Sequence, residues 1–319
     1  MITVLTGGTG GAKFVDGLRQ IVSPEELTII VNTGDDIVWW GLYVSPDIDS
    51  ITYTLANKLS QERGFGVKGD TFFCLGAMKQ LGLPAWFNVG DRDLATHLLR
   101  SKLLAEGKTM AEATAEIVSR LGVRARILPM SNSRVETRVT TAIGELGFAE
   151  YFVQRRYQDP VESVRFAGAS EAEPAPGVIE AIAASDFILL APSNPVTSIG
   201  PILAVPGIRE ALRNARACIA AVSPIVDKNA VSGPAAALMA AQGFEVSIGG
   251  VADCYRDFLD LLVVDSQDAV AAEKQRALGR RVHCVPTIMR KSEDRIALAK
   301  IVLAACHALP GKAASWETT

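Results

Sequence analysis

The chain begins with a short apolar run that leads into a cluster of glycines and a lysine. The stretch TGGTGGAK at residues 6–13 places four glycines within five positions and ends on Lys13. Glycine frees backbone N–H groups, and the N-terminus of a helix attracts anions. We therefore expect this loop to bind an anion such as a phosphate group, with a tight strand-to-helix turn as the alternative. The residues expected to contact the anion are Gly7, Gly8, Thr9, Gly10, Gly11 and Lys13.

This glycine loop matches neither of the two common phosphate-binding patterns. A Walker A loop has a glycine before its lysine and a hydroxyl residue after it, and Ala12 and Phe14 occupy these positions. A dinucleotide-binding loop has a third glycine where Lys13 stands. Because Phe14 has no hydroxyl to bind magnesium, we expect aspartates at the ends of other strands to bind the metal instead.

Four aspartates follow the second apolar run of the chain, which covers residues 27–31. Asp35 and Asp36 come directly after it, and Asp47 and Asp49 come a dozen residues later. Carboxylate oxygens suit Mg²⁺, usually together with substrate phosphates. We predict that these four residues supply the ligands of a magnesium site. Helix capping is an equally weighted interpretation of Asp47 and Asp49, and both roles can hold at once.

Other polar residues also stand at the ends of predicted strands. In open α/β sheets, ligands bind beyond the C-terminal ends of the strands. This rule selects five further residues. They are Asn32, Ser193, Asn194, Ser223 and Asp265.

A charged stretch, Asp91-Arg92-Asp93, begins a predicted helix. Asp93 and His97 are four residues apart and face each other, which we interpret as a surface pair. Arg92 is unfavourably placed against the helix dipole, which favours a phosphate or an acid as its partner. The adjacent Trp39 and Trp40 cannot both face the same way, and core or dimer interface is the favoured interpretation.

The bulk composition is that of a soluble globular protein. Of 319 residues, 49% are hydrophobic and 21% charged, with a net charge of −3. The dispersed Lys and Arg residues do not form the basic surface of a nucleic-acid-binding protein. No apolar stretch approaches the roughly 20 residues of a membrane span. Five cysteines without pairing or metal spacing suit a reducing compartment, so we predict a cytoplasmic protein without nucleic-acid or membrane partners.

Apolar runs that alternate with helical patterns predict an α/β fold with a Rossmann-like, doubly wound, mostly parallel sheet. The predicted strands cover 2–6, 27–31, 125–128, 187–191, 218–222 and 261–264. A β-hairpin is expected from 135–142 and 148–154, around a turn at 144–147.

Strand patterns are absent between about residues 46 and 122, where helical patterns replace them. Ile48, Ile51, Leu55 and Leu59 predict one helix, and Thr109 with Glu112 predicts a capping box at another. We predict a Rossmann-like nucleotide-binding domain at 1–46 and 123–319. An all-helical insert at 47–122 is expected to contribute to the substrate site.

Five stretches occur together in a familiar order. They are TGGTGGAKFVDGL at 6–18, VNTGDDIVWWGLYVSPDIDSITYTL at 31–55, WFNVGDRDLATHLLRS at 86–101, APSNPVTSIGPILAVPGIREAL at 191–212 and VSPIV at 222–226. Together they resemble the 2-phospho-L-lactate transferase (CofD/FbiA-like) family of deazaflavin coenzyme F-420 biosynthesis. The resemblance spans most of the chain and weakens beyond about residue 240.

The resemblance implies a transferase reaction. A GDP-linked small acid (lactate, enolpyruvate or glycerate) donates its phospho-acid moiety to the ribityl hydroxyl of the deazaflavin Fo, and GMP is released. Mg²⁺ as cofactor and a homodimer are implied as well. Phosphoryl transfer of this kind depends on positioning and charge neutralisation more than on covalent catalysis.

The resemblance also implies roles for the candidate residues. Asp47, Asp49 and Arg92 are expected to be catalytic, with Asp49, Arg92 and Trp86 also contacting the deazaflavin. The nucleotide site combines the glycine loop with Asn32, Ser193 and Asn194.

Two functions of other classes remain as alternatives. One is a non-catalytic regulator that binds nucleotide sugars, as in the related gluconeogenesis-factor family. The other is an NAD-dependent dehydrogenase in which Asp35 holds the ribose, although the missing third glycine counts against it.

Overall fold

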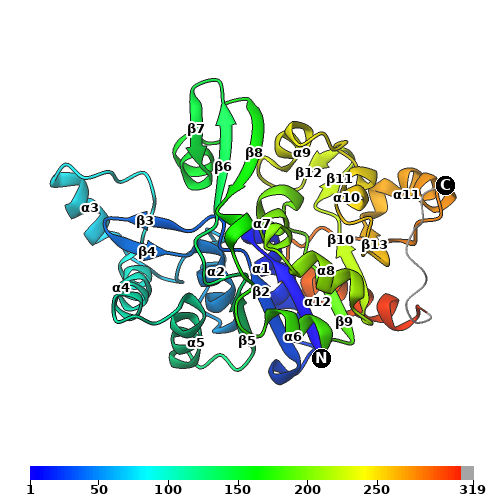
Figure 1. Ribbon diagram of the computed structural model, residues 1–319, viewed down its shortest axis with the longest axis horizontal. Coiled ribbons are helices and arrows are strands. Elements are labelled where there is room, and N and C mark those ends of the chain that lie inside the picture. Colours follow the sequence, from blue (N-terminus) through cyan, green and yellow to red (C-terminus); the bar gives the residue numbers. More distant parts are fainter. Residues whose placement is uncertain (310–319) are drawn as a thin grey trace.

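A seven-stranded sheet forms the centre of the protein in the computed structural model, which describes residues 1–309 (Figure 1). Its strand order is β14-β13-β10-β9-β1-β2-β5, and every neighbouring pair is parallel. The strands are β1 (Ile2–Thr6), β2 (Leu27–Val31), β5 (Arg126–Pro129), β9 (Phe187–Leu190), β10 (Cys218–Val222), β13 (Leu261–Val264) and β14 (Val282–Cys284).

Helices cover both faces of this sheet, which confirms the predicted doubly wound α/β fold. Alternate residues of a strand point to opposite faces, so that Ile29 and Ile30 belong to two different hydrophobic cores. One core includes residues of α1 (Gly8–Leu18), α2 (Pro46–Leu55), α5 (Met110–Arg120) and α12 (Ser292–His307). The other includes residues of α6 (Val178–Ala183), α7 (Gly200–Ala204), α8 (Ile208–Asn214), α9 (Ala235–Ala241), α10 (Ile248–Cys254) and α11 (Ala269–Ala277).

The region between β2 and β5 contains α2, α3 (Phe73–Gln80), α4 (Asp91–Ala105) and α5. The predicted capping box is confirmed, because Thr109 and Glu112 bond reciprocally at the start of α5. The first helix is shorter than predicted: it ends at Leu55, and Leu59 instead bridges to Val67. Ile48 and Ile51 pack into the core of the sheet. The division into a Rossmann-like domain and a helical insert at 47–122 remains a prediction.

Three small antiparallel sheets accompany the main one, and the predicted hairpin is wrong in its second strand. β6 (Glu136–Thr141) pairs with β7 (Gly144–Gly147), so the predicted turn is itself a strand. The residues expected to form the second strand make a helical turn, Glu150–Gln154. Glycines at 144 and 147 favour a turn, but a short, exposed edge strand tolerates them. The second partner of β6, β8 (Val161–Ala167), was not predicted.

The other two small sheets are the β3–β4 hairpin (Ile37–Trp39 and Leu42–Val44) and the β11–β12 hairpin (Ile225–Val226 and Asn229–Ala230). The β3–β4 hairpin lies with α3 and α4 at the left of Figure 1, and β6, β7 and β8 project at the top. Short helical turns complete the described chain. They are Pro24–Glu26, Ala169–Glu171, Pro195–Ile199 and Ser266–Asp268. Within residues 1–309, no helix combines the length and the apolar character needed to cross a membrane.

Candidate active site

The C-terminal ends of β1, β2 and β9 lie side by side and bring several predicted site residues into contact. The hydroxyl of Ser193, after β9, donates a hydrogen bond of 2.8 Å to the carbonyl oxygen of Gly7, after β1. Asn32, after β2, donates through Nδ2 to Asp47 at 3.0 Å, and the N–H of Gly8 donates to the same carboxylate at 2.8 Å. The first turn of α2 therefore brings Asp47 to the N-terminus of α1.

Three of the four loop glycines are required by close packing. A Cβ on Gly7 would lie 2.5 Å from Asp47 Oδ2, a Cβ on Gly10 would overlap the carbonyl oxygen of Pro192, and one on Gly11 would overlap the hydroxyl of Thr6. Gly8 has a φ of +67°, in the left-handed region that favours glycine. The turn geometry thus accounts for the glycines by itself. Anion binding by the loop remains a prediction, and one of its N–H groups already donates to Asp47.

The remaining residues of the predicted nucleotide site are arranged less uniformly. Thr9 and Lys13 are exposed on the first two turns of α1, where a ligand can reach them. Asn194 accepts hydrogen bonds from the N–H groups of Val196 at 2.9 Å and Thr197 at 3.4 Å, which caps the helical turn behind it. Its side chain therefore has a structural role independent of any nucleotide.

Asp35 and Asp36 lie in the turn after β2, and each has a carboxylate oxygen without a partner. Asp35 Oδ1 and Asp36 Oδ2 are buried and form no hydrogen bond within residues 1–309. Burial raises the pKa of Asp35 well above its usual range, and the nearby Asp47 charge raises it further. Burial also raises the pKa of Asp36, against the opposing effects of a Ser45 hydrogen bond (2.7 Å) and the Arg100 charge. The carboxyl groups of Asp35, Asp36 and Asp47 therefore lie near one another where burial disfavours their charged forms.

This arrangement fits a hard divalent cation. Free carboxylate oxygens are the ligands that Mg²⁺ prefers, and its charge would offset the like charges gathered here. Both oxygens of Asp47 already accept hydrogen bonds, and burial raises its pKa despite them. Asp35 and Asp36 thus have the freest oxygens of the four predicted ligands. The magnesium site itself remains a prediction.

The most extensive contacts of Asp49 come from a residue that no sequence pattern singles out. Arg100, on α4, is fully buried and donates to both Asp49 oxygens, through Nη2 to Oδ1 and through Nη1 to Oδ2 at 3.1 Å. His97 Nδ1 also lies 3.5 Å from Asp49 Oδ2, and His97 Nε2 lies 3.5 Å from Asp93 Oδ1. Tyr53 donates to Asp93 at 2.7 Å and completes the network.

The interpretation of Asp93 and His97 as a surface pair is therefore wrong. His97 is 2% exposed, and α4 buries Asp93, His97, Arg100 and Leu103. The spacing of these residues places them on one face of a helix, and this signal is present in the sequence. Three of the four residues are polar, however, and a polar helix face normally indicates exposure to solvent rather than burial. Asp49, Asp93 and His97 have ligand atoms within 4.8 Å of one another, but the Arg100 cation already neutralises Asp49 and disfavours a metal ion there.

Trp86 belongs to an aromatic cluster together with Trp39, Trp40 and Phe87. Its ring meets that of Trp39 edge-on at 4.8 Å, and Trp39 is in contact with the other two. The core interpretation is confirmed for Trp39, which is buried, whereas Trp40 is partly exposed. Trp39 Nε1 has no hydrogen-bond partner in the described part of the chain.

Arg92 is exposed at the start of α4. Its backbone N–H donates to Asp70 at 2.7 Å, and its guanidinium donates to the carbonyl oxygen of Lys68 at 3.3 Å. Arg92 is not part of the buried Arg100 network described above.

The last two strand-end candidates serve local structure. The Ser223 hydroxyl donates to the carbonyl oxygen of Ile225 at 2.9 Å. Asp265 accepts from the N–H of Thr287 at 2.8 Å and from that of Gln267 at 3.0 Å.

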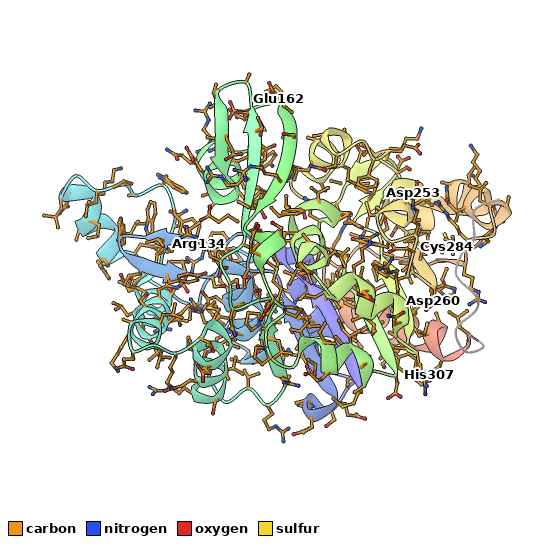
Figure 2. The ribbon with its side chains drawn as sticks, viewed as in Figure 1. Arg134, Glu162, Asp253, Asp260, Cys284 and His307 are labelled. Atoms are coloured by element: carbon orange, nitrogen blue, oxygen red, sulfur yellow. The ribbon has the colours of Figure 1, made fainter. Side chains whose placement is uncertain are left out.

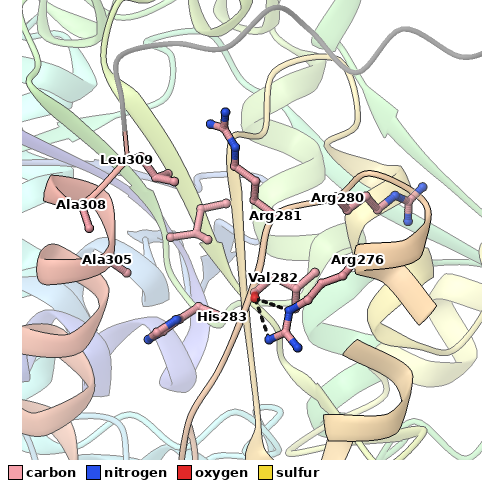
Figure 3. Close-up of a pocket in the computed structure, with 9 residues that line it drawn as sticks. Arg276, Arg280, Arg281, Val282, His283, Ala305, Ala308 and Leu309 are labelled. Carbon is pink, nitrogen blue, oxygen red and sulfur yellow. Dashed lines mark hydrogen bonds between the residues drawn. The ribbon is translucent and has the colours of Figure 1, made fainter. Parts of the chain in front are cut away.

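A surface hollow of about 380 Å³ lies beside β14, the edge strand at the other end of the sheet from β5 (Figure 3). It is lined by Leu261, Arg276, Arg280, Arg281, Val282, His283, Ala305, Ala308 and Leu309. Arg276 donates twice to the carbonyl oxygen of Val282, at 2.9 and 3.0 Å. In Figure 2, Cys284 and His307 mark this edge of the molecule. None of the predicted site residues lines the hollow.

The family model described as "2-phospho-L-lactate transferase CofD" matches residues 2–298 of the chain. The chain belongs to the CofD family. Proteins named 2-phospho-L-lactate transferase from Methanosarcina mazei and Methanothermobacter thermautotrophicus are 41% and 43% identical to it. The alignments cover 95% of this chain in both cases, and 99% and 97% of the relatives. A protein from Streptomyces coelicolor named phosphoenolpyruvate transferase is 42% identical, over 95% of this chain and 97% of its own.

This CofD family member is therefore a transferase, which argues against both the non-catalytic regulator and the dehydrogenase. Its fold is similar to that of a UPF0052 family protein from Bacillus halodurans, with a TM-score of 0.65 and 19% identity. That alignment covers 95% of this chain and 98% of the other. At this identity, the similarity concerns the fold alone.

Proposed function

We propose that this CofD family member transfers a phospho-acid moiety from a GDP-linked donor to the ribityl hydroxyl of the deazaflavin Fo in coenzyme F-420 biosynthesis, and releases GMP. The observation that supports this best is the meeting of the glycine loop and Asp47 at the ends of β1 and β2, beside Asp35 and Asp36. A diphosphate donor needs this combination of backbone donors, metal-binding carboxylates and nearby acids.

The donor would lie along the glycine loop, with Lys13 beside its diphosphate and Asn32 and Ser193 bordering the nucleotide. Asp35 and Asp36 would hold Mg²⁺ with Asp47, and the bound ion would neutralise charge on the diphosphate. Asp49 is left out of this ligand set because Arg100 already pairs with both of its oxygens. The residues of the chain then position the reactants, which is the main requirement of phosphoryl transfer.

In the transfer step, the ribityl oxygen forms a bond to the phosphorus that carries the small acid. The bond from that phosphorus to the GMP oxygen breaks, and GMP leaves with the bonding electrons. Asp49 would orient the hydroxyl and accept its proton as the new bond forms. Arg92 would stabilise the negative charge that develops on the transferred group.

The aromatic cluster around Trp86 offers a surface for the deazaflavin ring. Trp86 and Trp40 are partly exposed, and the ring of Trp86 meets that of the buried Trp39 edge-on. Aromatic side chains stack favourably on flat ligands, so we place the acceptor ring on Trp86.

The experiment that tests this function is mass analysis of the products formed from Fo, Mg²⁺ and each of three GDP-linked acids. The relatives are named for phospholactate and phosphoenolpyruvate, and glycerate is the third candidate acid. We expect one donor to give a phospho-acid ester of Fo together with an equal amount of GMP. Absence of this product with all three donors would overturn the proposal.

We also propose that the protein is a cytoplasmic homodimer. All five cysteines are free thiols, which suits a reducing compartment. Light scattering after size-exclusion chromatography would measure the mass in solution, and a monomer mass would refute the dimer.

A further inference from the structure

Arg100 is the largest side chain in the described chain that is fully buried. Its terminal nitrogens both donate to Asp49, which is only 4% exposed. Removing two charges from water is costly, and apolar residues of similar volume often stabilise a fold at least as well. Stability alone therefore does not explain an arginine at this position.

The contacts of Arg100 hold the Asp49 carboxylate from one side. Nη1 also lies 3.5 Å from the carbonyl oxygen of Tyr43 and 3.5 Å from Nδ1 of His97. The planar guanidinium matches the plane of a carboxylate when both oxygens accept from it. Each carboxylate oxygen has two lone pairs, so each Asp49 oxygen can accept a second hydrogen bond.

Asp49 and Arg100 come from different helices and are 51 residues apart in the chain. Asp49 lies in the first turn of α2, and Arg100 lies in the middle of α4. The pair therefore fixes the carboxylate of one helix with respect to the other, and with it the direction of its remaining lone pairs.

We propose that Arg100 is a positioning residue for the transfer reaction, which holds the Asp49 carboxylate in the orientation that meets the acceptor hydroxyl. This inference rests on the proposed function, because it requires Asp49 to act on that hydroxyl. Arg100 is fully buried and acts through Asp49 rather than on a substrate.

The first test compares Arg100→Lys with the wild type in steady-state transfer to Fo. Lysine keeps the charge but is a point donor that cannot hold both oxygens in one plane. A misplaced catalytic group costs about 10²-fold in rate, so we expect kcat to fall by about that factor. The KM of the donor should change by less than about threefold, because the donor does not contact Arg100. Arg120→Lys, an exposed position on α5, is the matched control and should keep the wild-type kcat.

The second test uses chemical rescue of Arg100→Ala by added guanidinium, with urea as a neutral molecule of the same shape. An arginine that only stabilises the fold changes the amount of folded enzyme, not the turnover of the enzyme that is folded. We expect guanidinium, and not urea, to raise the kcat of the folded variant by about tenfold, the value of one restored charge-assisted hydrogen bond. Donor binding and circular dichroism would establish the folded fraction.

Several outcomes would overturn the inference. Wild-type kcat in Arg100→Lys would do so, as would a folded Arg100→Ala that does not respond to guanidinium. If the alanine variant fails to fold, the kcat and KM values of Arg100→Lys decide by themselves. A wild-type protein without transfer activity would overturn the proposed function and this inference together, whereas an active wild type with unaffected variants would overturn only the inference.

Discussion

Replacing Asp35 by asparagine should stabilise the metal-free protein. Burial and the Asp47 charge both disfavour ionised Asp35, and they raise its pKa well above the usual range. Asparagine has nearly the same shape without the charge, so this cost disappears. Substitutions of this kind typically add about 1 kcal/mol to the free energy of unfolding. For a chain of this size we expect a rise in Tm of about 2 °C.

The same substitution should weaken the response of the protein to magnesium. An ion that binds only the folded state adds about 2.7 kcal/mol at 100 times its Kd. Asp35 has one of the two unpartnered carboxylate oxygens at the predicted site, so its loss should remove much of this increment. Thermal unfolding over a series of MgCl2 concentrations measures both effects. Glu162→Gln, an exposed carboxylate on β8 (Figure 2), is the control and should match the wild type.

The pH dependence of the effect follows from the direction of the pKa shift. Because the pKa of Asp35 is higher in the folded state, its favourable contribution is complete below the unfolded pKa of about 3.9. That contribution is lost as the pH rises through the folded pKa. The stability difference between Asp35→Asn and the wild type should therefore be near zero at acidic pH and increase toward neutral pH, in the absence of divalent cations.

Two results would refute this reasoning separately. A variant less stable than the wild type at neutral pH without metal would show that charge burial at Asp35 carries no net cost. An undiminished magnesium response in Asp35→Asn would show that this carboxylate does not bind the ion.

Three further predictions concern the loop and the buried ion pair. Gly10→Ala should lower the free energy of unfolding by about 2 kcal/mol, because its Cβ would overlap a backbone carbonyl, whereas Gly76→Ala in α3 has open space and should be neutral or stabilising in the same urea titration. Asp49→Asn should lower the free energy of unfolding by about 3 kcal/mol, because it leaves the buried Arg100 without its anion. The double variant Asp49→Asn/Arg100→Met should regain most of that stability but should not transfer the phospho-acid group, and equal stabilities of the single and double variants would contradict this. Lys13→Ala should weaken donor binding about tenfold in calorimetry without changing Tm, since its side chain is exposed; unchanged affinity would place the diphosphate elsewhere.

The strands of the central sheet were the most predictable part of the fold. β1, β2, β10 and β13 have the predicted bounds, because a parallel strand buried on both faces is a continuous apolar run. The missed strands, which include β14 at one edge of the central sheet, carry no such signal. β3, β4 and β14 have three residues each, and one of the seven residues of β8 is buried. Their pairing depends on distant partners rather than on local sequence.

The sequence by itself determined which strand ends carry the chemical groups, because chain order and the parallel sheet bring Gly7, Asn32 and Ser193 to one edge. Only the tertiary structure decided which side chains these groups contact. Asp47 at the N-terminus of α1 and Arg100 on Asp49 are contacts between segments far apart in the chain. A polar stripe on α4 looks like a solvated face until another helix covers it, since burial of a charge depends on the partner that compensates it. The sequence contains both Arg100 and Asp49, but it does not show that α4 contacts α2 and so brings the two charges together.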